Sequence, residues 1–196
     1  MTEQSSYQKK IQIRPIVVSL VMYLIVAVAT FRIVPTHFIF NRSESMPVGV
    51  YRITAKTPNR GSIVGACIPE PYATFVRSRG YIASGRCIGG IRPVMKYVAA
   101  IAGDSVEIRG SGLSINGESV PNTQILLIDP LGLSVPHQTG IHVLRPGEFW
   151  LLSNHLSGSL DSRYFGPVTK ILGVVEPVLT ESDFCGLPFV HAYLNC

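Results

Sequence analysis

Charged side chains are scarce in this chain of 196 residues: 15% are Asp, Glu, Lys or Arg, whereas 46% are hydrophobic. A disordered protein has the opposite balance, because it lacks the apolar groups that form a core. The sequence also has no internal repeat and no low-complexity tract. We therefore expect one folded domain with an appendage, and the apolar composition suits a protein that touches a bilayer.

Metal-ligand spacing is also absent from the sequence. The four cysteines, Cys67, Cys87, Cys185 and Cys196, form no Cys-x-x-Cys pair. The histidines other than His155 show no spacing typical of a metal site. We therefore expect neither a metal nor a cofactor, and disulfides in an external compartment explain the cysteines better.

Basic charge is concentrated in one part of the sequence. Residues 42–96 hold nine basic and two acidic side chains, whereas residues 97–196 hold four basic and nine acidic ones. This asymmetry fits either nucleic acid or anionic lipid headgroups. We favour inner-membrane lipid as a partner and expect no nucleic acid, because the basic segment directly follows an apolar span and contains no nucleic-acid motif.

The N-terminal segment changes from basic to apolar. Residues 1–14 are polar and basic, which predicts a cytoplasmic tail. Residues 15–34 have about the length and apolarity needed to cross a bilayer, which predicts a single transmembrane anchor. The alternative is a cleaved secretory signal, because Ala27-Val28-Ala29 matches a small-x-small cleavage site. We favour the anchor, which would place residues 35–196 in the periplasm of a bacterial cell.

The remainder of the chain has the pattern of a mainly β domain. Short apolar runs alternate with Gly, Pro and Asn, which is typical of strands and turns. Asn116-Gly117 between alternating apolar residues predicts a hairpin, and 129–132 predicts a turn. Further strands are expected at 63–68, at 94–108 with a break at Gly103-Asp104, at 149–152 and at 171–175.

Residues 68–92 are rich in Gly, Pro, Ser and Arg and lack a core pattern, which predicts an insertion on the domain. A bridge between Cys67 and Cys87 would clip this loop and contribute on the order of 3 kcal/mol by restricting the unfolded chain. A bridge between Cys185 and Cys196 would fix the C-terminal tail. This is one of the three pairings that four cysteines allow, and buried free thiols remain an alternative.

Residues 41–51, Asn-Arg-Ser-Glu-Ser-Met-Pro-Val-Gly-Val-Tyr, contain a candidate nucleophile, Ser45. A serine hydroxyl needs a base to take its proton and donors to receive the oxyanion that its attack creates. Ser43 lies two residues earlier, so in an extended backbone both side chains point the same way. Taken alone, this stretch fits an ordinary polar Ser/Pro/Gly loop better than a catalytic segment.

Lys96 is a candidate base, because it stands alone in the apolar run Met95-Lys96-Tyr97-Val98-Ala99-Ala100. A solvated lysine is protonated at neutral pH, but burial disfavours the charged form and lowers its pKa by several units. The alternative is a surface lysine on an edge strand.

A third segment, 157–168, carries the core Ser159-Leu160-Asp161-Ser162-Arg163. Together with 45–51 and 95–108, in this order, it resembles the type I signal peptidases, a family of serine-lysine peptidases. The form Ser-Met-Pro-x-Gly-x-Tyr is most similar to the conjugative-transfer, or TraF, branch of that family. The resemblance spans roughly residues 35–178.

The resemblance implies a signal-peptidase-like β domain that cleaves exported precursors by acyl transfer. Its implied site consists of the nucleophile Ser45, the base Lys96, an oxyanion hole from the Ser43 hydroxyl and the Ser45 N–H, the lysine-orienting Ser159, and the supporting ion pair Asp161 and Arg163. The TraF likeness further implies a conjugative pilin precursor as substrate, with cleavage or cyclisation, and a transfer apparatus as partner.

Three alternatives remain open. The protein could be a general leader peptidase of secreted proteins, or a noncatalytic membrane component of a conjugation or secretion apparatus. His155 with Asp161 could also supply a Ser-His-Asp base in place of Lys96.

The chain departs from the ordinary leader-peptidase pattern at several positions. Pro47 directly follows Met46, Tyr97 replaces the usual arginine, and Ser62 stands where an aspartate is common. Residues 153–155 read Ser-Asn-His in place of Gly-Asp-Asn. These changes leave the proposed dyad intact and favour the TraF branch.

Overall fold

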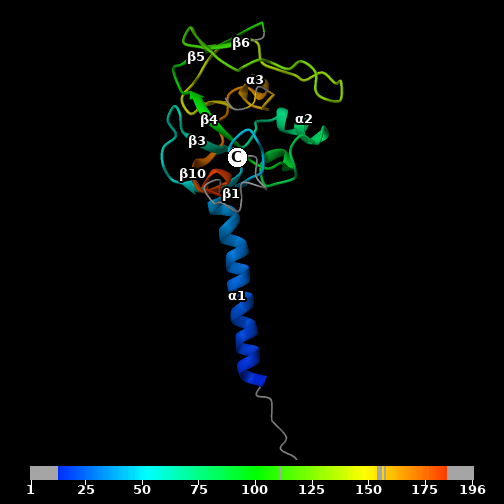
Figure 1. Ribbon diagram of the computed structural model, residues 1–196, viewed down its shortest axis with the longest axis vertical. Coiled ribbons are helices and arrows are strands. Elements are labelled where there is room, and N and C mark those ends of the chain that lie inside the picture. Colours follow the sequence, from blue (N-terminus) through cyan, green and yellow to red (C-terminus); the bar gives the residue numbers. More distant parts are fainter. Residues whose placement is uncertain (1–12, 111, 154–155, 157, 185–196) are drawn as a thin grey trace, which may run out of the picture. The chain divides into compact units, whose positions relative to one another are not determined.

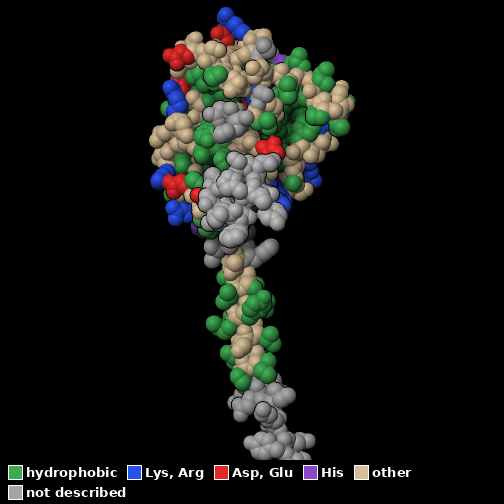
Figure 2. Space-filling model, in the orientation of Figure 1, with side chains coloured by type: hydrophobic (Ala, Val, Ile, Leu, Met, Phe, Trp, Pro, Cys, Tyr) green, Lys and Arg blue, Asp and Glu red, His purple; other side chains and the backbone are tan. Residues whose placement is uncertain are grey.

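The computed structural model describes residues 13–110, 112–153, 156 and 158–184 (Figure 1). The chain divides into two compact units, Met1–His37 and Phe38–Cys196. The first contains helix α1, Ile13–His37, whose described side chains are mostly large and apolar and are exposed (Figure 2). The sequence predicted a transmembrane anchor at 15–34. Among the residues described, no helix has a stretch with both the length and the hydropathy that a membrane span requires.

The second unit is mainly β, as predicted, and contains two antiparallel sheets. The larger sheet has six strands in the order β1-β2-β10-β3-β4-β9. Their bounds are β1 Phe38–Asn41, β2 Gly49–Thr54, β3 Ile63–Ala66, β4 Val94–Ala100, β9 Trp150–Leu152 and β10 Ile171–Thr180. The strands expected around 63–68, 94–100, 149–152 and 171–175 are therefore confirmed, with shifted ends. Because β4 pairs with both β3 and β9, it is not an edge strand.

The smaller sheet has four strands in the order β7-β6-β5-β8. Their bounds are β5 Ser105–Arg109, β6 Gly112–Ile115, β7 Glu118–Val120 and β8 Gly140–Val143. Asn116 and Gly117 connect β6 to β7 with φ angles of 52° and 84°, the left-handed conformation that a tight hairpin turn needs. The predicted hairpin is confirmed. In Figure 1, β5 and β6 lie at the opposite end of this unit from β1 and β10.

The insertion differs from its prediction, because it contributes to the core. Residues 68–92 include helix α2, Tyr72–Ser78, and the short helix η1, Ile88–Gly90. Tyr72, Ala73 and Val76 on α2 are buried in the main hydrophobic cluster. The expectation of a loop without a core pattern was wrong, because a helix of about two turns needs only these few apolar positions to bury a face.

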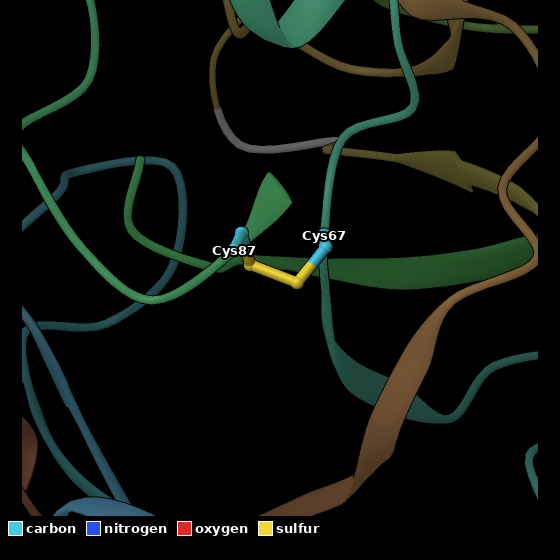
Figure 3. The surroundings of a disulfide bond; sticks show 2 residues. All are labelled: Cys67 and Cys87. Atoms are coloured by element: carbon cyan, nitrogen blue, oxygen red, sulfur yellow. A yellow bond between two sulfur atoms is a disulfide. The ribbon is translucent and has the colours of Figure 1, made fainter. Parts of the chain in front are cut away.

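A disulfide joins Cys67 to Cys87 and closes this insertion, the pairing expected for these two cysteines (Figure 3). Both cysteines are buried in the main cluster. Cys185 and Cys196 lie outside the described residues. The remaining helices are α3, Ser162–Phe165, and α4, Glu181–Phe184.

Two hydrophobic clusters stabilise the unit. The main one includes Trp150, Val98 and Phe165 and extends over both sheets. The smaller one contains Ile39, Met46, Tyr51, Met95 and Val175, from β1, β2, β4, β10 and the β1–β2 connection. It therefore anchors the segment that carries Ser45 against the strand that carries Lys96.

Removing the disulfide should destabilise the fold. The replacement of Cys67 and Cys87 by serine should lower the free energy of unfolding by about 3 kcal/mol, because the bridge closes a loop with a sequence separation of 20 residues. Urea denaturation followed by tryptophan fluorescence measures this change. Dithiothreitol should destabilise the wild type and leave the double variant unchanged. Equal midpoints for the two oxidised proteins would contradict the prediction.

Candidate active site

Ser45 lies on the short connection between β1 and β2, which is shaped by hydrogen bonds from Asn41. The Asn41 amide Nδ2 donates to the carbonyl oxygens of Ser43, Met46 and Pro47 over 2.9, 2.9 and 3.0 Å. Tyr51 donates to the Pro47 carbonyl over 2.7 Å. The connection is therefore a fixed turn, and Asn41 is a structural residue that sequence reasoning did not single out.

Gly49, at the end of this connection, permits a close contact with β10. A Cβ at this position would lie 2.2 Å from the Leu179 carbonyl oxygen, a distance that no side chain tolerates. Glycine is thus required for β2 to pair with β10 directly after the Ser45 turn.

Lys96 is buried, with only 4% of its surface exposed, and its amine lies beside Ser45. Nζ lies 2.8 Å from Ser45 Oγ and 2.8 Å from Ser159 Oγ. Its strand lies between β3 and β9, which rules out a surface lysine on an edge strand. The fold therefore brings together Ser45, Lys96 and Ser159, which come from three separate segments.

Burial changes the protonation of Lys96. Loss of solvation lowers its pKa to about 8, although the negative charge of Asp161 acts in the opposite direction and the positive charge of Arg163 lowers it further. About a tenth of the amine is therefore neutral at pH 7 and about half at pH 8, far more than for a solvated lysine. A neutral amine has a lone pair that accepts a proton, which a solvated ammonium lacks.

Ser43 lies where an oxyanion donor was predicted. Its Oγ is 3.0 Å from Ser45 Oγ, and the Ser45 N–H donates to Ser43 Oγ over 3.3 Å. The two predicted donors thus contact one another in the free protein. A carbonyl oxygen that enters between them would exchange this weak contact for its own hydrogen bonds.

Asp161 and Arg163 form an ion pair in which both side chains are fully buried. Arg163 Nε and Nη2 donate to the two Asp161 carboxylate oxygens, each over 2.8 Å. Arg163 Nη2 also donates to the Ser159 carbonyl over 3.0 Å. The pair thereby fixes the backbone of the serine that contacts Lys96, which accords with the supporting role predicted for it.

Ser153 connects the same ion pair to the predicted nucleophile. Its N–H donates to Asp161 Oδ2 over 3.1 Å, and its hydroxyl donates to the Ser45 carbonyl over 2.8 Å. Sequence reasoning noted Ser153 only as a departure from the Gly-Asp-Asn pattern. That departure was the available signal, because glycine has no hydroxyl with which to make the contact. His155, the alternative base, lies outside the described residues.

A cavity of about 560 Å³ opens beside Ser45 and Lys96. The Ser45 turn, the insertion and β4 contribute to its walls, as do the segments around 126–135 and 156–164. Its apolar side chains include Phe40, Ile82, Leu126 and Leu160. We call this space the cleft. Its volume is in the range of cavities that hold several residues of a peptide or a small ligand.

The signal peptidase family, peptidase S26, matches residues 11–179, and the chain belongs to this family. Within it, the similarity to TraF proteins assigns the chain to the TraF branch. The plasmid transfer protein TraF of Escherichia coli is 37% identical over 144 residues, covering 71% of this chain and 81% of the relative. The probable conjugal transfer protein TraF of Sinorhizobium fredii is 38% identical over 145 residues, covering 71% of this chain and 76% of the relative.

A solved structure of a signal peptidase I from Enterococcus faecalis is also similar. It is 24% identical, covers 65% of this chain and all of its own, and has a TM-score of 0.35.

Breaking the buried ion pair between Asp161 and Arg163 should strongly destabilise the protein. Asp161→Asn should lower the free energy of unfolding by about 3–5 kcal/mol, because it leaves the Arg163 guanidinium buried without a counter-charge. Chemical denaturation at pH 7 measures the effect. Arg52→Gln is the control, because the pair of Arg52 with Glu176 is solvent-exposed and should change stability by about 1 kcal/mol or less. Similar losses in the two variants would contradict the prediction.

Proposed function

We propose that the protein is a serine endopeptidase that cleaves exported precursors by acyl transfer, with Ser45 as nucleophile and Lys96 as general base. The observation that carries this proposal is the 2.8 Å contact between Ser45 Oγ and the buried amine of Lys96. A noncatalytic binding domain has no need to bury a lysine against a serine hydroxyl, which costs desolvation energy. Membership in a peptidase family adds support.

In the proposed acylation step, Ser45 Oγ attacks the scissile carbonyl carbon while the neutral Lys96 amine takes the hydroxyl proton. Ser159 accepts a hydrogen bond from Nζ and so directs the lone pair toward Ser45. The tetrahedral intermediate then collapses, the C–N bond breaks, and Lys96 returns the proton to the leaving amine. An ester between Ser45 and the acyl fragment remains.

The developing oxyanion would be received by the Ser45 N–H and the Ser43 hydroxyl. These groups are adjacent in the free protein, and the weak hydrogen bond between the Ser45 N–H and Ser43 Oγ would have to open to admit the oxyanion. Ser153 holds the Ser45 carbonyl, which helps to fix the direction of the donor N–H. Loss of one such donor typically lowers the rate about a hundredfold or more.

Release of the acyl-enzyme needs a second nucleophile, either water or an amine. Lys96 would accept a proton from that nucleophile as it attacks the ester, and return it to Ser45 Oγ when the ester breaks. Water gives hydrolysis, whereas the N-terminal amine of the same substrate gives a circular product. Both outcomes use the same residues of this chain.

We further propose that the substrate is the precursor of a conjugative pilin and that the enzyme acts with a conjugative transfer apparatus. The transfer functions printed in the names of the TraF relatives support this assignment. We propose the inner membrane as the location, with residues 35–196 in the periplasm. Support comes from the basic residues 1–14, the apolar residues that follow and the external disulfide.

Ser45→Ala and Lys96→Ala should each abolish processing of the host system's propilin, because one removes the nucleophile and the other the base. Membranes that contain each variant at levels matched by blot are incubated with propilin, and the product is followed by mass spectrometry. Lys170→Ala is the matched control and should retain wild-type processing, because Lys170 is exposed and does not line the cleft.

Full processing by Lys96→Ala would exclude the proposed dyad. Processing of general secretory precursors but not of propilin would favour a leader peptidase. Absence of cleavage in the wild type would favour a noncatalytic component.

Activity should also depend on the charge of Lys96. Because its pKa is lowered to about 8, kcat/KM should rise with pH, reach half its maximum near pH 8 and level off above it. Initial rates on a soluble peptide between pH 6 and pH 10 test this, with circular dichroism at each pH to confirm folding. A profile that is flat from pH 6 to pH 8, or that falls across that range, would contradict lysine as the base.

A further inference from the structure

Four of the nine basic side chains of segment 42–96 form ion pairs in the folded protein. Arg52 and Lys56 pair with Glu176, Arg60 with Asp104, and Arg79 with Asp129. Arg77 donates to the Gly89 carbonyl. All of the acidic partners come from residues 97–196. Ion pairs between the two parts of the sequence therefore reduce its charge asymmetry.

Two arginines that remain lie at the cleft. Arg42 and Arg92 are exposed and line it, and neither forms an ion pair with any residue that the structure describes. Arg42 precedes Ser45 by three residues, and Arg92 precedes Lys96 by four. We call these two residues the cleft arginines. Both therefore line the same cleft as the proposed catalytic pair.

No acidic side chain of the described cleft lining offsets the cleft arginines. Asp129 is the one acidic residue there, and its carboxylate is already bound by Arg79, by the Tyr81 hydroxyl and by the N–H groups of Leu131 and Leu133. Glu44, next to Ser43 in sequence, is not among the residues that line the cleft. The cleft therefore carries a positive charge of two guanidinium groups, besides the partly neutral Lys96.

We propose that the cleft arginines select substrates with a carboxylate close to the scissile bond. This inference rests on the proposed peptidase function and adds a substrate class to it. Uncompensated charges in a concave site attract the opposite charge, and guanidinium groups bind carboxylates through paired N–H donors. The carboxylate is either an acidic side chain or the free C-terminus of a short leaving peptide. Both offer the same chemistry to Arg42 and Arg92.

Matched peptides test this selectivity on the full chain in neutral detergent. The peptides are internally quenched and have a small residue before the scissile bond. Each pair places Glu in one peptide and Gln in the other at a single position, and the series covers the positions from three before to four after that bond. A second pair ends, four residues after the bond, in a free acid or an amide. For at least one pair, wild-type kcat/KM should be about three- to tenfold higher for the carboxylate peptide, and less so at high salt.

The Arg42→Gln/Arg92→Gln double variant should lose this ratio. Arg86→Gln is the matched control: Arg86 is also exposed and without an ion pair among the described residues, but it is not part of the described cleft lining, so the ratio should stay. The affinity of the same peptides for the Ser45→Ala protein is measured by fluorescence anisotropy. This second measurement does not depend on catalysis. The pair that shows the preference identifies the source of the carboxylate.

Equal binding and equal kcat/KM for every pair would overturn the proposal while leaving the peptidase function intact. Conversely, preferential binding of carboxylate peptides without cleavage by the wild type would support the cleft arginines and remove the peptidase function. Sedimentation with phosphatidylglycerol vesicles tests the competing ligand. If the double variant loses vesicle binding but keeps the peptide ratio, the arginines bind lipid headgroups and the proposal is wrong.

Discussion

The buried amine of Lys96 is the constraint on which the rest of the site depends. Desolvation lowers its pKa from 10.5 to about 8, so below pH 8 folding carries a penalty of about 3 kcal/mol relative to a solvated lysine. This penalty decreases as pH rises from 8 toward 10.5, because the unfolded chain then loses the proton that the folded chain has already released. Lys96 lies on an interior strand with apolar residues beside it. The same burial causes the penalty and lowers the pKa, so that the neutral amine can accept a proton.

Asp161 holds the surrounding polar groups in place. Its carboxylate accepts hydrogen bonds from the Arg163 side chain, from the Arg163 backbone N–H in α3 and from the Ser153 backbone N–H. Through Arg163 it fixes Ser159 beside Lys96, and through Ser153 it fixes the backbone of Ser45. Both partners of the proposed dyad are thus positioned from one buried ion pair, although neither touches it. Such a pair adds less to stability than to the fixed geometry of its neighbours.

The sequence predicts the β-rich fold and the members of the site because both depend on local patterns. Alternation around Asn116-Gly117 defines a hairpin, and the three ordered motifs identify Ser45, Lys96 and Ser159. Ser153 and Asn41 escaped prediction, because their hydrogen bonds depend on how the chain turns and not on a pattern. Helix α2 was missed for a related reason: a single short helix with a few apolar residues resembles a loop until the core that it covers is known.

Charge shows how tertiary structure adds to what the sequence predicts, while contact with lipid stays a prediction. The basic segment 42–96 suggested a lipid-binding face, but the fold brings Asp104, Asp129 and Glu176 to four of its cations. Substrate recognition depends on which charged side chains have no ion pair and on where those side chains lie. Among the arginines that pairing leaves over, Arg42 and Arg92 line the cleft, where they can attract an anion. Residual charge next to a reacting centre acts on the substrate, whereas the same charge on an open surface is largely screened.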